Sequence, residues 1–126
     1  METKHLDARG KGEVDYDYKN DTLFFKIKNR TYLKSLDFGN LVLDVDKEGF
    51  ITGIQIFDAS KLFKMEKDAL LKVRSWEFNT KVENKVINVQ LSFEVVKRNK
   101  VIARQNFERE TTAQLHDSEV LCTIPA

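Results

Sequence analysis

The sequence has few of the features that cross-link a small protein through disulfides or direct a protein to a membrane. Its 126 residues include one cysteine, Cys122, so no disulfide can form within the chain and an oxidising compartment is not indicated. No stretch approaches the ~20 consecutive apolar residues of a membrane helix. Residues 1–12 are too polar for a signal peptide. These absences predict a cytoplasmic protein.

An excess of charge of one sign is also missing. The chain has 21 Lys and Arg residues against 20 Asp and Glu residues, so its net field does not attract nucleic acid or a membrane surface. No linker rich in Gly, Pro or Ser divides the chain, and its length suffices to bury a core. We therefore expect a flexible N-terminus over residues 1–12 and a single domain over residues 13–126.

Alternating apolar and polar residues predict strands in both halves of the chain. The longest clean alternation runs from Ile87 to Val95, and a period of two is typical of a strand with one buried face. Hairpin-length connections favour antiparallel pairing. The predicted strands are residues 13–18, 22–28, 41–46, 50–57, 76–82, 87–95, 101–107 and 120–124.

One short helix is expected between the two sets of strands, over about residues 59–72. Asp58 is a suitable N-cap, because its carboxylate can accept the amides of a first helical turn. The helical spacing behind it is only partial, and the helix is open to a break near Lys64. The predicted fold class is α+β, a mainly antiparallel sheet of seven to eight strands with the helix packed on one face.

Five short motifs follow one another in the first half: Tyr16-Asp17, Asp21-Thr22-Leu23, Asp44-x-Asp46-x-x-Gly49, Gly53-Ile54-x-Ile56 and Asp58-Ala59-Ser60-Lys61. In this order and spacing, Tyr16 to Lys61 resembles the domain-of-unknown-function 2283 (DUF2283) family of small prokaryotic proteins. Gln55 stands where that family usually has an acidic residue. The resemblance implies a small β-rich domain with a short helix, and it supplies no activity. It makes residues 13–72 the family-like half and residues 73–126 a C-terminal β-meander.

The turn from Asp44 to Gly49 begins like a calcium-binding loop. Asp44, Asp46 and Glu48 would supply oxygen ligands at alternate positions, and Gly49 would permit the sharp turn. The twelfth position is Gln55, which cannot act as the bidentate carboxylate of such a loop. The sequence therefore favours a solvated hairpin turn, with Asp44, Asp46 and Glu48 as the candidate ligands if a metal binds.

The remaining polar residues form no catalytic or zinc-binding pattern. Three carboxylates share one face of the first predicted strand: Glu13, Asp15 and Asp17. Such a face is more typical of a charged edge that discourages aggregation than of an acid/base pair. His5 and His116 lie far apart in the sequence, Ser60 is explained by helix capping, and Cys122 fits a small buried residue. We expect no catalytic residue, no cofactor and no metal.

Two basic stretches are candidate contacts for nucleic acid. Four basic residues surround one predicted turn: Lys97, Arg98, Lys100 and Arg104. A second stretch contains Lys26, Lys28 and Arg30. Such residues can hold single-stranded nucleic acid where aromatic residues such as Phe24 or Trp76 offer stacking. The near-neutral total charge favours two solvated turns instead.

The sequence thus favours a non-catalytic binding or assembly module. An open sheet can pair with a second copy of the chain or with an extended segment of an unidentified protein partner. Homodimerisation is the leading hypothesis. The first alternative is a nucleic-acid or regulatory binder that acts through the basic hairpin turns. The second is an enzyme or calcium binder at the Asp44–Gly49 turn.

Overall fold

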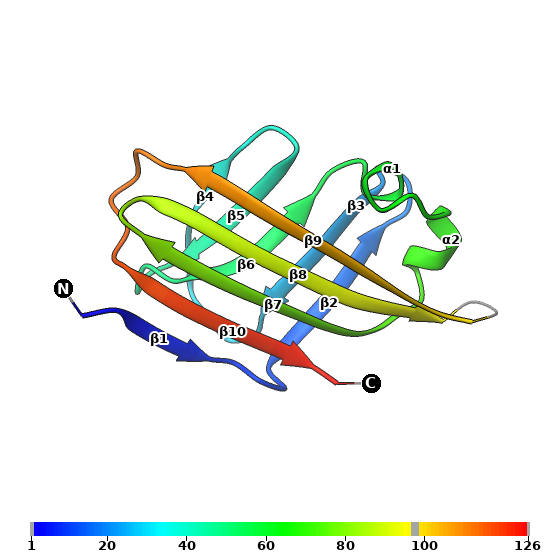
Figure 1. Ribbon diagram of the computed structural model, residues 1–126, viewed down its shortest axis with the longest axis horizontal. Helices are drawn as coiled ribbons and strands as arrows, with labels where there is room; N and C mark the ends of the chain where they lie inside the picture. The colour runs from blue at the N-terminus through cyan, green and yellow to red at the C-terminus, as the bar shows by residue number, and fades with distance from the viewer. Residues whose placement is uncertain (1, 97–98, 126) are drawn as a thin grey trace.

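The computed structural model describes residues 2–96 and 99–125, which form two five-stranded sheets (Figure 1). Sheet A has the order β1-β10-β7-β8-β9. Its strands are β1 (Lys4–Asp7), β7 (Val73–Glu83), β8 (Val86–Val96), β9 (Lys100–Glu110) and β10 (Ser118–Ile124). Sheet B has the order β2-β3-β6-β5-β4. Its strands are β2 (Gly12–Asp17), β3 (Thr22–Ile27), β4 (Tyr32–Asp37), β5 (Leu41–Asp46) and β6 (Ile51–Ile56).

The protein is mostly β, and the expectation of one sheet with seven to eight strands is wrong. Alternation along each strand gives each sheet one apolar face, and here two such faces cover each other. Neighbouring strands are antiparallel, except that β1 runs parallel to β10. β1 lies within the N-terminal segment that was expected to be flexible.

Aromatic rings from both sheets meet in the space between them. The ring of Phe25 in β3 lies 5.1 Å from the ring of Trp76 in β7 and 5.7 Å from that of Phe93 in β8, between centroids. In Figure 1 the long strands of sheet A cross over those of sheet B. One buried apolar cluster contains residues of both sheets, so neither sheet has a core of its own.

Two short helices replace the single helix that was expected over residues 59–72. They are α1 (Ala59–Phe63) and α2 (Lys67–Leu70). Lys64 ends α1 with a left-handed φ of 53°, which confirms the break near this residue. α1 packs against sheet A, because the ring centroid of Phe63 lies 4.7 Å from that of Phe93. Neither helix of the described chain has the length and apolar content needed to cross a membrane.

Candidate functional site

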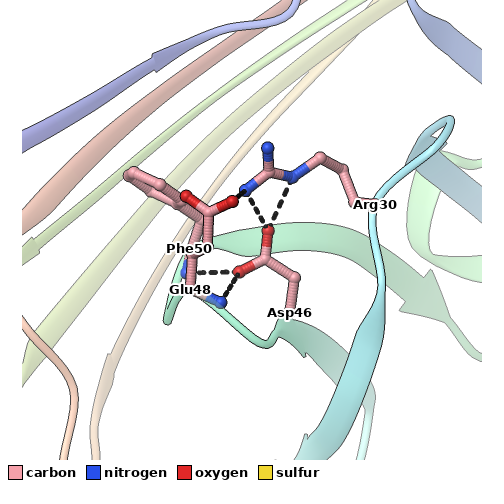
Figure 2. Close-up of polar contacts among 4 residues, drawn as sticks. All are labelled: Arg30, Asp46, Glu48 and Phe50. Atoms are coloured by element: carbon pink, nitrogen blue, oxygen red, sulfur yellow. Dashed lines mark hydrogen bonds and ion pairs between the residues drawn. The ribbon is translucent and has the colours of Figure 1, made fainter.

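A buried ion pair holds the turn between β5 and β6 (Figure 2). The carboxylate of Asp46 is 1% exposed, and its Oδ1 accepts hydrogen bonds from the N–H groups of Glu48 (2.9 Å) and Phe50 (3.0 Å). Its Oδ2 accepts from Nε of Arg30 at 2.7 Å and lies 2.7 Å from Nη2. Nη2 also lies 3.2 Å from Oε1 of Glu48. The guanidinium of Arg30 lies over the ring of Phe50.

This ion pair ties the loop after β3 to the β5–β6 turn. Burial alone would lower the pKa of Arg30, but the hydrogen bond and charge of Asp46, with the charge of Glu48, raise it. The positive charge of Arg30 therefore stays beside Asp46. Gly49, with a φ of 86°, closes the turn as expected.

The candidate calcium ligands are engaged with other residues. Both oxygens of Asp46 already have partners. Oδ1 of Asp44 accepts hydrogen bonds from Oγ of Ser35 (2.9 Å) and Nε2 of Gln55 (3.1 Å). Among the described residues, no group of three or more His, Cys, Asp and Glu side chains is placed to hold a metal ion. A cation at this turn would have to displace Arg30.

A second polar network fastens α1 to the β2–β3 turn. Asp21 is 6% exposed, and its Oδ1 accepts hydrogen bonds from the hydroxyl of Tyr16 and from the N–H of Ser60. Its Oδ2 accepts from Oγ of Ser60 at 2.6 Å. The N–H of Ala59 donates to the backbone oxygen of Asp21 at 3.0 Å. Asp21 therefore caps α1 from outside the helix.

Asp58 stands at the N-cap position of α1, as expected, but the prediction that its carboxylate caps the helix is wrong. Asp58 has a left-handed φ of 51° and makes no capping hydrogen bond through its side chain. Asp21 lies 39 residues before Ser60, too far for a local capping pattern to reveal it. Its one sequence signal is its place in the Asp21-Thr22-Leu23 motif.

The Asp21 network shifts the pKa values of two of its members. Burial alone would raise the pKa of Asp21, but the hydrogen bonds from Ser60 and Tyr16 outweigh it and lower the pKa. Burial and then the hydrogen bond to Asp21 raise the pKa of the Tyr16 hydroxyl. A charged Asp21 and a neutral Tyr16 are thus the stable forms, so the network acts as a fastening between α1 and the sheet.

The other candidate acid/base residues lie apart. β2 is an edge strand of sheet B, so its three acidic residues do lie on a charged edge. Oε1 of Glu13 lies 2.8 Å from Nζ of Lys26, and Asp17 accepts hydrogen bonds from Asn20, while Asp15 is exposed. His5 is on β1, and His116 lies beside Gly49. Cys122 is completely buried, as expected.

The second basic stretch lines a hollow of about 460 Å³ on the outer side of sheet B. Lys26, Lys28 and Arg30 meet there with Tyr32 and Asp44. Of these basic residues, Lys26 is paired with Glu13, and Arg30 with Asp46. The structure therefore brings these three basic residues together, but pairs two of them with carboxylates.

Only part of the first basic stretch, the one around residues 97–104, lies within the described residues. Lys97 and Arg98 lie outside the described residues, and Lys100 is the first residue of β9. Arg104 is exposed on β9. The aromatic candidates for base stacking are less available than expected, because Trp76 is 2% exposed and Phe24 is half-buried.

β9 corresponds to the strand predicted over residues 101–107, but its edge position was not predicted. It contains 11 residues and lies at the end of the strand order of sheet A. Its residues Val101 and Ile102 are 43% and 59% exposed. Strand length is readable from the alternation, but the sequence does not say which strand forms an edge.

Comparisons with known proteins agree with the resemblance seen in the sequence. The family model for "Protein of unknown function (DUF2283)" matches residues 13–60. A protein of Methanosarcina mazei named putative hypoxanthine phosphoribosyltransferase is 34% identical over 90 residues, which are 71% of this chain and 73% of that protein. An uncharacterized protein of Methanocaldococcus jannaschii is 32% identical over 113 residues, which are 88% of this chain and 97% of that protein. No solved structure matches the chain.

Proposed function

The chain belongs to one family with its Methanosarcina mazei and Methanocaldococcus jannaschii relatives, with the DUF2283 segment at residues 13–60, and from this starting point we propose that it is a binding and assembly module. Its first partner is a second copy of itself, which pairs through β9. The observation that carries the proposal is the edge position of this long strand.

The free side of β9 supports pairing with another strand. β9 hydrogen-bonds to β8 along its whole length, and no strand of the described chain lies on its other side. Backbone groups on such an edge are a template for a further strand. Exposed Val101 and Ile102 add apolar area to this edge.

The order of charges along β9 favours a second copy as the partner. Arg104 and Glu108 point to the same side of the sheet, because they are four residues apart in one strand. In an antiparallel pair with Asn106 opposite Asn106 of the second copy, each Arg104 faces a Glu108 across the new ladder. Opposite charges in such positions stabilise strand pairing, and like charges destabilise it. The contact is self-complementary, as a two-fold dimer requires.

Charge-swap variants in sedimentation equilibrium test this pairing. The unchanged chain should form a dimer, and Arg104→Glu or Glu108→Arg alone should raise the dimer Kd by roughly tenfold, because each puts like charges opposite each other. The double variant Arg104→Glu/Glu108→Arg should restore the dimer. Lys11→Glu, an exposed change away from β9, is the matched control. A strict monomer at millimolar concentration, or dimers unaffected by the single changes, would refute the proposal.

The name of the Methanosarcina mazei relative supplies a second candidate, phosphoribosyl transfer to hypoxanthine. What favours it is the identity of 34% over 73% of that protein. Against it, the cations in the sheet B hollow are largely paired with carboxylates, whereas phosphate groups are held by cations that are available to them. Incubation with hypoxanthine and a phosphoribosyl donor, followed by chromatography, decides the matter. Formation of the nucleotide would replace the assembly function by an enzymatic one.

A further inference from the structure

The outer side of sheet A carries a band of amide side chains. The strand register places Asn79, Gln90 and Asn106 in one row across β7, β8 and β9. Lys81, Asn88 and Glu108 form the next row across the same strands. Strands lie ~4.8 Å apart, so each row is on the order of 10 Å long. We name these six residues the sheet A trough.

The trough is hollowed and open to a ligand. Its six residues, with Glu119 beside them, line a hollow of about 600 Å³, a size typical of ligand sites. All six are exposed. In the described part of the chain, the amide groups of Asn79, Asn88, Gln90 and Asn106 have no hydrogen-bond partner in another residue. Their donors and acceptors therefore face solvent.

The chemistry of the lining selects the kind of ligand. A side-chain amide offers two donors and one acceptor oxygen, which matches groups that both donate and accept, as hydroxyls do. The positive charge of Lys81 and the negative charge of Glu108 cancel within the trough, and Glu119 adds a negative charge. A polyanion would be repelled by Glu119 and gain little from Lys81, which lies 3.8 Å from that carboxylate. A neutral ligand that is rich in hydroxyls fits this lining best.

We propose that the sheet A trough binds a neutral oligosaccharide, whose hydroxyls hydrogen-bond to Asn79, Gln90 and Asn106. Because the ligand crosses the strands, its successive sugars meet amides from successive strands. This inference does not require the dimer. Antiparallel pairing of β9 about Asn106 would, however, set the amide rows of two copies end to end.

Nuclear magnetic resonance of the ¹⁵N-labelled full chain tests the trough directly, because side-chain amides give their own signals. The probes are cellohexaose, maltohexaose and mannohexaose, with a thymidine oligonucleotide as the polyanion. At least one neutral probe should shift the side-chain signals of Asn79, Gln90 and Asn106 in a saturable manner. The oligonucleotide should leave them unchanged.

Two variants distinguish binding at the trough from nonspecific binding elsewhere on the surface. Gln90→Met keeps the shape of the side chain but removes its hydrogen bonds, and it should weaken binding by about threefold to tenfold. Gln114→Met removes an exposed amide outside the trough and should change nothing. Arg104→Glu, which weakens the proposed dimer, should still bind. Absence of shifts with all three neutral probes, shifts outside the trough, or preference for the oligonucleotide would overturn the inference.

Discussion

Replacing Arg30 with methionine should destabilise the protein by about 2–3 kcal/mol, because it leaves a buried carboxylate without its counter-charge. Methionine keeps an unbranched apolar side chain at this position but removes the guanidinium, which lies over the ring of Phe50. Asp46 would keep its two backbone N–H donors but lose the guanidinium, and it is 1% exposed. Removing one member of a buried pair typically costs about 3–5 kcal/mol. Arg30 has a side-chain exposure of 22%, so water can partly replace the guanidinium, and the expected cost of about 2–3 kcal/mol lies at or below the lower end of that range.

Urea unfolding followed by tryptophan fluorescence measures this change. Trp76 is the one tryptophan of the sequence and lies between the sheets, so its emission reports their separation. The matched control is Lys26→Met, which breaks the ion pair with Glu13. Those two side chains are 60% and 42% exposed, and such pairs contribute about 0–1 kcal/mol. If Arg30→Met costs no more than Lys26→Met, the reasoning about the buried pair is wrong.

Three further changes have defined outcomes. Asp21→Asn should lower the melting temperature at neutral pH and weaken the acid dependence of stability. The lowered pKa of Asp21 makes its contribution complete above the ordinary aspartate pKa of ~3.9 and lost as the pH falls below it; equal pH dependence in melts of both proteins would contradict this. Gly12→Ala would bring a Cβ within 2.6 Å of Trp76 ring atoms, and should cost about 1–3 kcal/mol in urea titrations. Burial raises the pKa of Cys122 to about 12, so a thiol reagent at neutral pH should modify the unfolded chain and spare the native one; rapid native labelling would count against it.

Along β8, local pattern was enough to predict which residues point inward. Ile87, Val89, Leu91, Phe93 and Val95 are all buried, because alternation follows directly from strand geometry. The turn at Gly49 also follows from a local preference, because glycine readily adopts a left-handed φ, and the break near Lys64 follows from the incomplete helical spacing behind Asp58. The division into two sheets does not, since an apolar face looks the same whether a helix or another sheet covers it.

The candidate site depended on contacts that carry no local signal. Arg30 and Asp46 are 16 residues apart, and Asp21 and Ser60 are 39 apart. Sequence reasoning found Arg30 only as a basic residue and Asp46 only as a candidate ligand. Their pairing can be seen only in the tertiary structure, because the sequence gives the charge of a carboxylate but not the residue with which it pairs.

The division into two sheets has a consequence for the matched segment taken by itself. The DUF2283 match at residues 13–60 spans sheet B, whereas β7 to β10 lie beyond it. Without those strands, Leu23, Phe25, Leu41 and Ile56, which are fully buried here, would meet water. A polypeptide limited to the matched segment would need another molecule to pack on this apolar face of sheet B. In this protein that packing is intramolecular, because the second half of the chain supplies β7 to β10 of sheet A.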